Sequence, residues 1–387
     1  MKLPIDLKAV IEAATDIESA RNTPVSVSVL IDDSAPGDVA AHVRSAFVGA
    51  GAHARVTVGY FVGPAFSPYE GDDMAVIVAG FSEEVGRRAA EIRAAGVPVM
   101  VVTSVPRLVA DMASAYGNPI PEGDLVAPEG VEGCEADGDA ACTSGEVAGA
   151  HVGVLAGIRA AKSAGTGAAA GSSGAAASSP DVSDAPIPID AAAAAALDRR
   201  MGEWVVAACR EKRLALALPF PFVRRPLSLE AVSATSLQNA GIGLVLFIPG
   251  ADMPLMTLNQ AKMLLQIAAA YGEPMSAARA KELAAIVGGA FACRSVARQV
   301  AGAVPAIGWA VKAGVGYAGT KAMGLAAVEY FERGGSIAGL AGVVSTATAK
   351  ATQIAGDVAA TPAGARVLST VKTAVRQGAA SVLKKTE

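Results

Sequence analysis

The turn from Asp32 to Val39 is the place where residue types and spacing could support phosphate chemistry. A nucleotide-binding P-loop needs glycines whose backbone amides surround the phosphates, a lysine for the β- and γ-phosphates and a hydroxyl for magnesium. When Gly37 is aligned with the second glycine of that motif, Asp38 takes the place of the lysine and Val39 that of the hydroxyl. Because an aspartate there would repel a triphosphate, this turn predicts no functional P-loop.

Asp32 and Asp33 leave two interpretations open. They could form a functional pair at the carboxyl edge of a flavodoxin-like sheet that binds something other than a nucleotide triphosphate. Acidic residues also stabilise turns without any further role. The segment 103–106, Thr-Ser-Val-Pro, follows a later strand at the place where a GTPase would carry its guanine-reading Asn-Lys-x-Asp motif. If this half descends from a GTPase, it has lost the catalytic groups.

Other reactive side chains are scattered. The three histidines, His42, His53 and His151, have no metal-ligand spacing, and the four cysteines contain no C-x-x-C pair. Eight acidic residues between Glu122 and Glu146 lack the spacing of an EF-hand and predict a solvated loop. We therefore assign no catalytic, cofactor-binding or metal-binding residue and expect no cofactor.

The first 120 residues alternate between short apolar segments and segments of helical period, which predicts an α/β domain with a parallel sheet, either Rossmann-like or a degenerate P-loop GTPase-like fold. An amphipathic helix is expected near the start, within residues 1–20. Strands are expected at Val25–Ile31, Arg55–Val62, Met74–Ala79 and Val97–Thr103, and helices at Pro36–Ala50, Ser82–Ala95 and Pro106–Tyr116. The last two strands are nearly all apolar, which indicates burial on both faces of the sheet.

Composition divides the chain into two domains. Residues 161–180 contain eight Ala, five Ser and four Gly, too little apolar surface to offset chain entropy. We therefore predict an α/β domain at 1–149, a flexible linker at 150–187 that runs from acidic to Ala/Gly/Ser-rich, and an all-α, Ala/Gly-rich domain at 188–387. Asp190 is the expected N-cap of the first helix, which should extend to Arg213.

Charge and hydropathy argue against nucleic acid as a partner and favour a membrane. The net charge is −4, which argues against nucleic acid. Residues 231–330 contain eleven charged residues, and 231–251 contain none, a length that could cross a bilayer. The segment 362–387 could form a basic amphipathic helix on an anionic membrane or pack on its own domain. We expect association with the bacterial cytoplasmic membrane, either integral or from the cytoplasmic side; a soluble helical bundle that self-associates is the alternative.

A resemblance to a known family covers about a quarter of the chain, from Ser233 to Gly335. The residues that carry it are Ile248–Pro254, Leu258–Met263, Ala270–Glu273, Gly288-Gly289, Ala297-Arg298, Val304–Trp309, Gly319–Gly324 and Tyr330–Glu332. In order and spacing they resemble the YcjF-like family, the bacterial domain of unknown function numbered 697. The resemblance implies a helical, inner-membrane-associated module and carries over no activity.

The same residues have a physical interpretation of their own. Asp252 and the prolines around it predict a turn between two helices, the second of which should break at Gly272–Pro274, with Ser276 capping the next helix. Taken together, the sequence predicts a non-catalytic membrane-associated scaffold or regulatory protein with a protein partner or a second copy of itself. The alternative is a GTPase-like enzyme that binds a nucleotide through an unconventional phosphate site.

Overall fold

A computed structural model describes residues 6–48, 51, 53–61, 71–128, 186–245, 252–284, 286 and 308–347. These residues belong to one compact unit made of Met1–Pro128 and Pro186–Glu387. Most of the predicted linker, the acidic segment after Pro128 and the basic segment 362–387 lie outside the described residues.

The first part of the unit is a five-stranded parallel sheet, as the alternation of strands and helices predicted. Its strands are β1 (Val25–Ile31), β2 (Ala54–Tyr60), β3 (Met74–Val78), β4 (Val99–Val102) and β5 (Leu125–Val126). They lie in the order β2-β1-β3-β4-β5, and every neighbouring pair is parallel. This is the flavodoxin-like order of doubly wound sheets.

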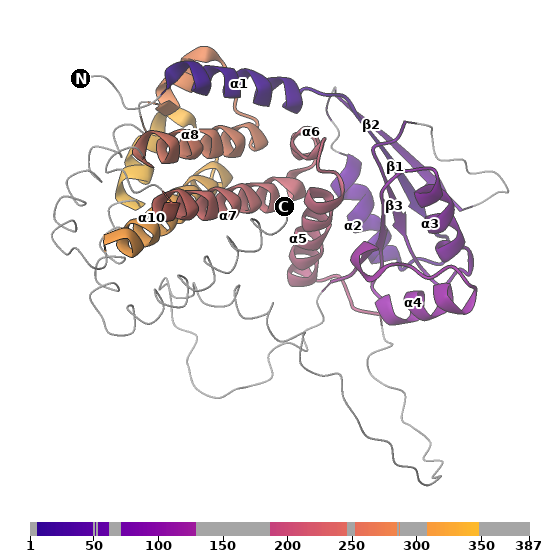
Figure 1. The fold of residues 1–387 in the computed structure, drawn as a ribbon. Coiled ribbons are helices and arrows are strands. Elements are labelled where there is room, and N and C mark those ends of the chain that lie inside the picture. The colour runs from indigo at the N-terminus through magenta and orange to yellow at the C-terminus, as the bar shows by residue number, and fades with distance from the viewer. Residues whose placement is uncertain are drawn as a thin grey trace, which may run out of the picture. The chain divides into compact units, whose positions relative to one another are not determined.

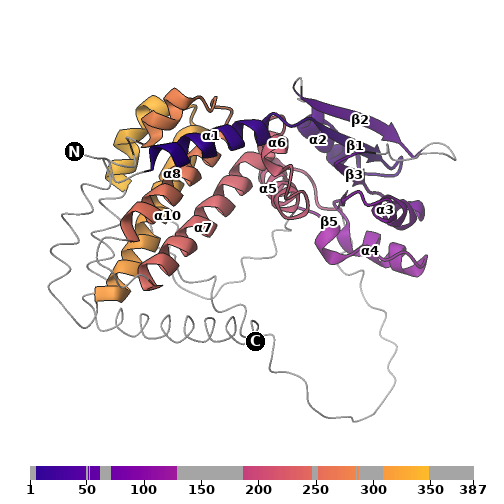
Figure 2. The same ribbon diagram turned by 45° about the horizontal axis from the view of Figure 1, so that its top comes forward.

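Helices cover the two faces of the sheet (Figure 2). On one face α2 (Gly37–Val48) and α5 (Ala191–Ala208) pack against the valines of β1 and the apolar side chains of β3 and β4. On the other, α3 (Glu84–Ala94) and α4 (Pro106–Ala115) pack against Leu30, Ala75 and Ile77. Every residue of β3 and β4 is buried, which confirms the expectation drawn from their continuous apolar sequence.

The sequence analysis did not predict one of the five strands. β5 and the short 3-10 helix at Glu122–Asp124 lie inside the segment that was predicted to be a solvated acidic loop. That prediction is wrong for residues 122–126, because Val126 is buried and pairs with Val102. A two-residue strand at the edge of a sheet is too short to produce a periodic pattern.

The helix after the predicted linker packs against the sheet and also against the helical part that follows it. Asp190 caps α5 by accepting a hydrogen bond from the amide of Ala193 at 2.8 Å, as predicted. The helix ends at Ala208 rather than at Arg213, and the chain turns into the short helix α6 (Arg213–Ala217). Through α5, a segment that follows residues 129–185 completes a face of the sheet formed before them.

The remaining helices form the second part. Among the described residues they are α7 (Pro221–Val245), α8 (Asp252–Ala270), a helix at 277–284, α10 (Gly308–Glu332), a 3-10 helix at Ile337–Gly339 and a helix at 340–347. α1 (Leu7–Arg21), although it precedes β1, lies beside α8 (Figure 1) and buries Val10, Ala14 and Ile17 in the same core. The guanidinium of Arg21 donates to the carbonyl of Glu273 at 2.8 Å. Thus α1 joins the helical part, whereas α5 joins the sheet.

The predicted break at Gly272–Pro274 is confirmed, whereas Asp252 lies in the helix and the residues before it, 246–251, are outside the described ranges. α8 begins at Asp252 and ends at Ala270, and Gly272 has a φ of +92°, a left-handed conformation that favours glycine. Ser276 accepts a hydrogen bond from the amide of Arg279 at 3.3 Å, as a capping residue should. The first fifteen residues of the uncharged run 231–251 belong to α7.

None of the helices in the described ranges combines the length and the apolar character that a membrane span needs. In α7 the first half of the uncharged run contains polar residues, which lower the apolar character of the helix. Two of them, Ser236 and Asn239, are buried within the protein. The transmembrane helix considered from the sequence is therefore not found in this part of the chain.

A candidate binding site at the carboxyl edge of the sheet

A pocket lies where three neighbouring strands end. Phe61 follows β2, Asp32 and Asp33 follow β1, and Phe81 follows β3. The chain leaves β1 toward β2 on one side while β3 lies on the other, so this is the point at which the strand order reverses. Doubly wound sheets bind ligands at that point. The cavity measures about 640 Å³, and its lining comprises Asp32, Asp33, Ser34, Phe61, Phe81, Ser82, Glu84, Arg87 and Arg88.

Asp32 serves to hold the two loops that form the pocket. Its side chain is buried, and Oδ2 accepts hydrogen bonds from the amides of Gly80 at 2.9 Å and Ser82 at 3.3 Å. The hydroxyl of Ser34 donates to the same oxygen at 2.9 Å, and the Ser34 amide donates to Oδ1 at 3.2 Å. With four donors on one carboxylate, Asp32 connects the loop after β1 to the loop after β3 and has the structural role of an acidic turn residue.

Gly80 lets the two loops meet. A Cβ atom at this position would lie 2.3 Å from the backbone carbon of Ser34 and 2.4 Å from the backbone nitrogen of Ala35. The Phe81 amide next to it donates to the Ser34 hydroxyl at 2.7 Å. The close approach therefore needs a glycine, and it fixes the backbone from which the Phe81 ring projects.

Asp33 differs from its neighbour in every respect that matters for binding. It is exposed and contacts no hydrogen-bond or ion-pair partner among the described residues, although it lines the same pocket. Phe81 is 44% exposed, which is unusual for so large an apolar side chain. Thus the loops donate hydrogen bonds to Asp32, whereas the exposed carboxylate of Asp33 is available to a ligand.

The arginines of the pocket are paired with glutamates. Arg87 lies 3.1 Å from Glu84 and 2.6 Å from Glu91, while Arg88 lies 3.5 Å and 3.9 Å from the same two carboxylates. The hydrogen bond and charge of Glu91 raise the pKa of the Arg87 guanidinium above its ordinary value. The glutamates of α3 thus offset the charge of the two guanidinium groups.

The turn that was compared with a P-loop has no phosphate cradle. A Cβ atom at Gly37 would meet nothing within 4 Å, so no close backbone approach requires that glycine. The carboxylate of Asp38, at the lysine position, accepts a hydrogen bond from the Ile189 amide at 3.1 Å and so holds the segment that leads into α5. That this turn is not a functional P-loop stays a prediction from the residue types.

Cys209 and His42 do not line the pocket, and each contacts another part of the fold. Burial, and to a smaller extent the charge of Asp73, raises the pKa of the Cys209 thiol to about 12, which keeps it protonated at neutral pH. His42 Nε2 lies 2.8 Å from the carboxylate of Asp198 and links α2 to α5. His53 is exposed, and His151 lies outside the described residues. Within the described segments no group of three His, Cys, Asp or Glu side chains is arranged to hold a metal ion.

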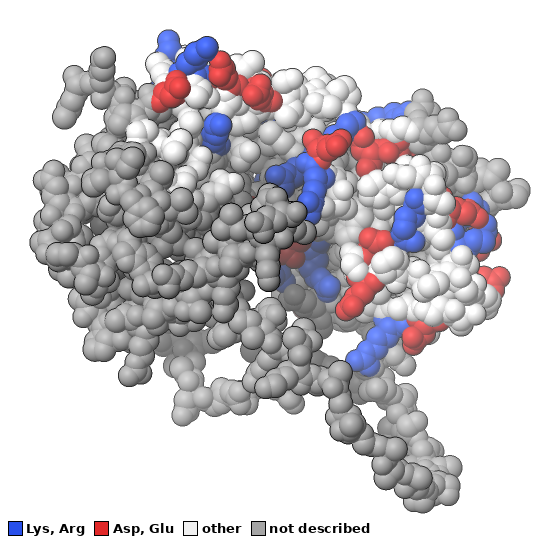
Figure 3. Space-filling model, in the orientation of Figure 1, with Lys and Arg blue, Asp and Glu red and all other residues white. Residues whose placement is uncertain are grey.

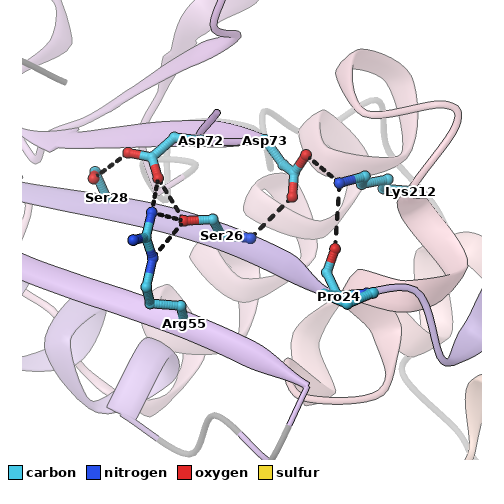
Figure 4. Close-up of polar contacts among 7 residues, drawn as sticks. All are labelled: Pro24, Ser26, Ser28, Arg55, Asp72, Asp73 and Lys212. Carbon is cyan, nitrogen blue, oxygen red and sulfur yellow. Dashed lines mark hydrogen bonds and ion pairs between the residues drawn. The ribbon is translucent and has the colours of Figure 1, made fainter. Parts of the chain in front are cut away.

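The amino end of the same sheet carries a second aspartate pair, Asp72 and Asp73 (Figure 4). The hydroxyls of Ser26 and Ser28 each donate to the carboxylate of Asp72 at 2.5 Å, and Arg55 lies 3.2 Å from it. Asp73 accepts from the Ser26 amide at 2.9 Å and pairs with Lys212 at 2.6 Å, and Lys212 also donates to the carbonyl of Pro24. This pair is entirely structural.

A buried polar network joins α7, α8 and α10. The amide nitrogen of Asn239 donates to the hydroxyl of Thr320 at 3.0 Å, and Gln260 donates to the same hydroxyl at 2.8 Å. Asn259 donates to the side-chain oxygen of Asn239 at 3.1 Å. Asn259, Gln260 and Thr320 are among the residues that carry the family resemblance. Their contacts fix the packing of helices, a role that turn chemistry did not suggest.

Comparison with known proteins adds no name to this geometry: no protein-family model, no curated protein and no solved structure matches the chain. The resemblance to the YcjF-like family therefore remains an inference from the residues quoted for it.

Sequence reasoning placed Asp32 and Asp33 at the correct edge but missed the aromatic side chains beside them. Phe61 directly follows β2, and Phe81 follows the second small residue after β3. The positions of these two residues could have indicated the site, because the residues that follow the strands of a parallel sheet meet at one edge. The strand order that makes these three ends neighbours could not be read from the sequence.

Proposed function

We propose that the chain is a non-catalytic scaffold or regulatory protein that binds a small ligand at the carboxyl edge of β2, β1 and β3. The position of the pocket at the reversal of strand order carries this proposal. The state of the reactive groups supports it, since Asp32 is occupied by four hydrogen bonds and the thiol of Cys209 is buried and protonated.

A ligand-observed NMR screen of small molecules against the full chain tests the site. We expect molecules that bind the wild type to lose binding in Phe81→Ala and to keep it in Leu237→Ala, which removes an apolar side chain that is 70% exposed on α7. Ligands that bind Phe81→Ala unchanged would place the site elsewhere and contradict the proposal.

Titration with GTP, GDP and ATP in the presence of magnesium separates this proposal from the alternative of a GTPase-like enzyme. We expect no micromolar binding, because carboxylates rather than a lysine face the place where phosphates would lie. Micromolar affinity for any of the three would favour the enzyme.

We also propose that the helical part associates with the bacterial cytoplasmic membrane, as the sparse charge of residues 231–330 suggests. Three leucines on α7, α8 and α10, Leu237, Leu255 and Leu325, are exposed and could contact lipid. Fractionation of cells with carbonate extraction tests the attachment, and recovery in the supernatant without detergent or high salt would oppose it.

A further inference from the structure

The pocket is lined by acidic side chains and by two aromatic side chains. The central strand β1 ends in Asp32 and Asp33, and its two neighbours in the sheet end in Phe61 on one side and Phe81 on the other. All four residues line one cavity. Phe61 is partly buried and packs against the core beneath it. Phe81 is 44% exposed, so much of its side chain is accessible to a ligand.

Negative charge exceeds positive charge at this edge. The lining contains the three carboxylates of Asp32, Asp33 and Glu84 and the two guanidinium groups of Arg87 and Arg88. Glu91, outside the lining, also pairs with both arginines. The donors to Asp32 are neutral amides and a hydroxyl, so they leave its charge uncompensated. On the face of the α/β part that Figure 3 shows, acidic and basic side chains are interspersed.

We infer that this pocket binds an organic ammonium ion. The inference rests on the proposed function, namely that the carboxyl edge is a ligand site, and it names the class of ligand. An alkylated ammonium group is attracted to the faces of aromatic rings by the ring quadrupole and is held in place by a nearby carboxylate. Phe61 and Phe81 supply the rings, and Asp33 supplies a carboxylate that has no hydrogen-bond or ion-pair partner within the described ranges.

Other ligand classes fit these residues less well. A phosphate or carboxylate would meet Asp32 and Asp33, and the arginines nearby are already paired with Glu84 and Glu91. A divalent metal ion prefers several oxygen ligands, whereas the oxygens of Asp32 are taken by the loops. A neutral aromatic molecule could contact the rings but would leave the charge of Asp33 unused.

Calorimetric titration of the full chain with choline tests the inference, with 3,3-dimethylbutan-1-ol as the neutral molecule of the same shape and inorganic phosphate as the anion. We expect choline to bind at least about fivefold more tightly than the neutral molecule, since cation–π attraction adds to the attraction of Asp33. Phosphate should not bind. Equal affinity for choline and its neutral counterpart, or tighter binding of phosphate, would overturn the inference.

Two variants locate the binding. Asp33→Asn should weaken choline binding about tenfold and leave the neutral molecule unaffected, while the control Asp16→Asn, an exposed carboxylate on α1, should change neither. Phe81→Leu keeps the apolar surface but removes the ring, so it should weaken choline more than the neutral molecule. Choline binding that survives both pocket variants would also overturn the inference. If the NMR screen finds only uncharged or anionic ligands that depend on Phe81, the ligand site stands and the assignment of an ammonium ion is wrong.

Discussion

The two ends of the sheet each carry a pair of consecutive aspartates, and the pairs differ in how many of their oxygens the fold uses. At the amino end, Asp72 and Asp73 are both occupied, one by Ser26, Ser28 and Arg55 and the other by Lys212 and a backbone amide. At the carboxyl end, Asp32 is occupied and Asp33 is not. Paired carboxylates in a sequence therefore indicate a site only where the surrounding loops leave one of them without a donor.

The largest effect is expected from Asp72→Ala. The Asp72 side chain is 1% exposed, and its removal takes away the carboxylate to which the hydroxyls of Ser26 and Ser28 donate. We expect a loss of about 3 kcal/mol in the free energy of unfolding, measured by urea titration. The double variant Ser28→Ala/Asp72→Ala should lose less than the sum of the two single changes. A cost below about 1 kcal/mol would show that this pair is not structural.

Asp32→Ala should destabilise the protein by about 2 kcal/mol, because it leaves the buried amide of Gly80 without a partner and releases the loop after β1. It should also abolish binding at the pocket, because it frees the backbone that positions Phe81. Asp32→Asn keeps one acceptor oxygen, so its stability should lie between that of the wild type and that of Asp32→Ala. Urea unfolding and the NMR screen measure the two effects separately. An unchanged stability would remove the structural role assigned to this carboxylate.

Lys212→Met should have a smaller effect, a loss of about 1 kcal/mol in the free energy of unfolding. Its ion pair with Asp73 is partly exposed, with 36% of the lysine side chain accessible, and such pairs contribute little. Urea titrations at low and high salt check this, since the difference between wild type and variant should shrink as salt screens the pair. A difference that grows with salt would be incompatible with an electrostatic contact.

Asp33→Asn should leave the free energy of unfolding within about 0.5 kcal/mol of the wild type, because an exposed side chain without a partner contributes little to stability. Thermal and urea unfolding provide the measurement. The combination of unchanged stability with weakened ligand binding is what distinguishes Asp33 from the other three aspartates. A destabilisation as large as that of Asp32→Ala would show that Asp33 stabilises the fold.

Much of the sheet could be predicted from local patterns, because strands such as Val25–Ile31 and Met74–Val78 consist of apolar or alternating residues. The expected and observed ranges of these strands differ by at most one residue. The polar residues of β1 also have an explanation in the structure. Ser26 and Ser28 point away from α2 and α5, toward the carboxylate of Asp72.

The candidate site was less accessible to sequence reasoning. The aspartates after β1 could be identified, but their different roles depend on Gly80 and Ser82, which approach Asp32 only after the sheet has formed. Likewise, the polar residues Asn239 and Thr320 lie 81 positions apart, and no local pattern indicates that their side chains meet. Contacts between distant segments decide which polar residues are structural, and a single sequence does not display them.

The exchange of helices between the two parts has a consequence for the integrity of the chain. Cutting the backbone between residues 128 and 186 would give one fragment that retains α1 and a second that retains α5. The first fragment would still hold the core around Ile17, and the second would still cover the sheet through Leu197 and Met201. Each piece would need the other to bury its own apolar surface, so the nicked protein should stay associated and fall apart only under conditions that unfold it.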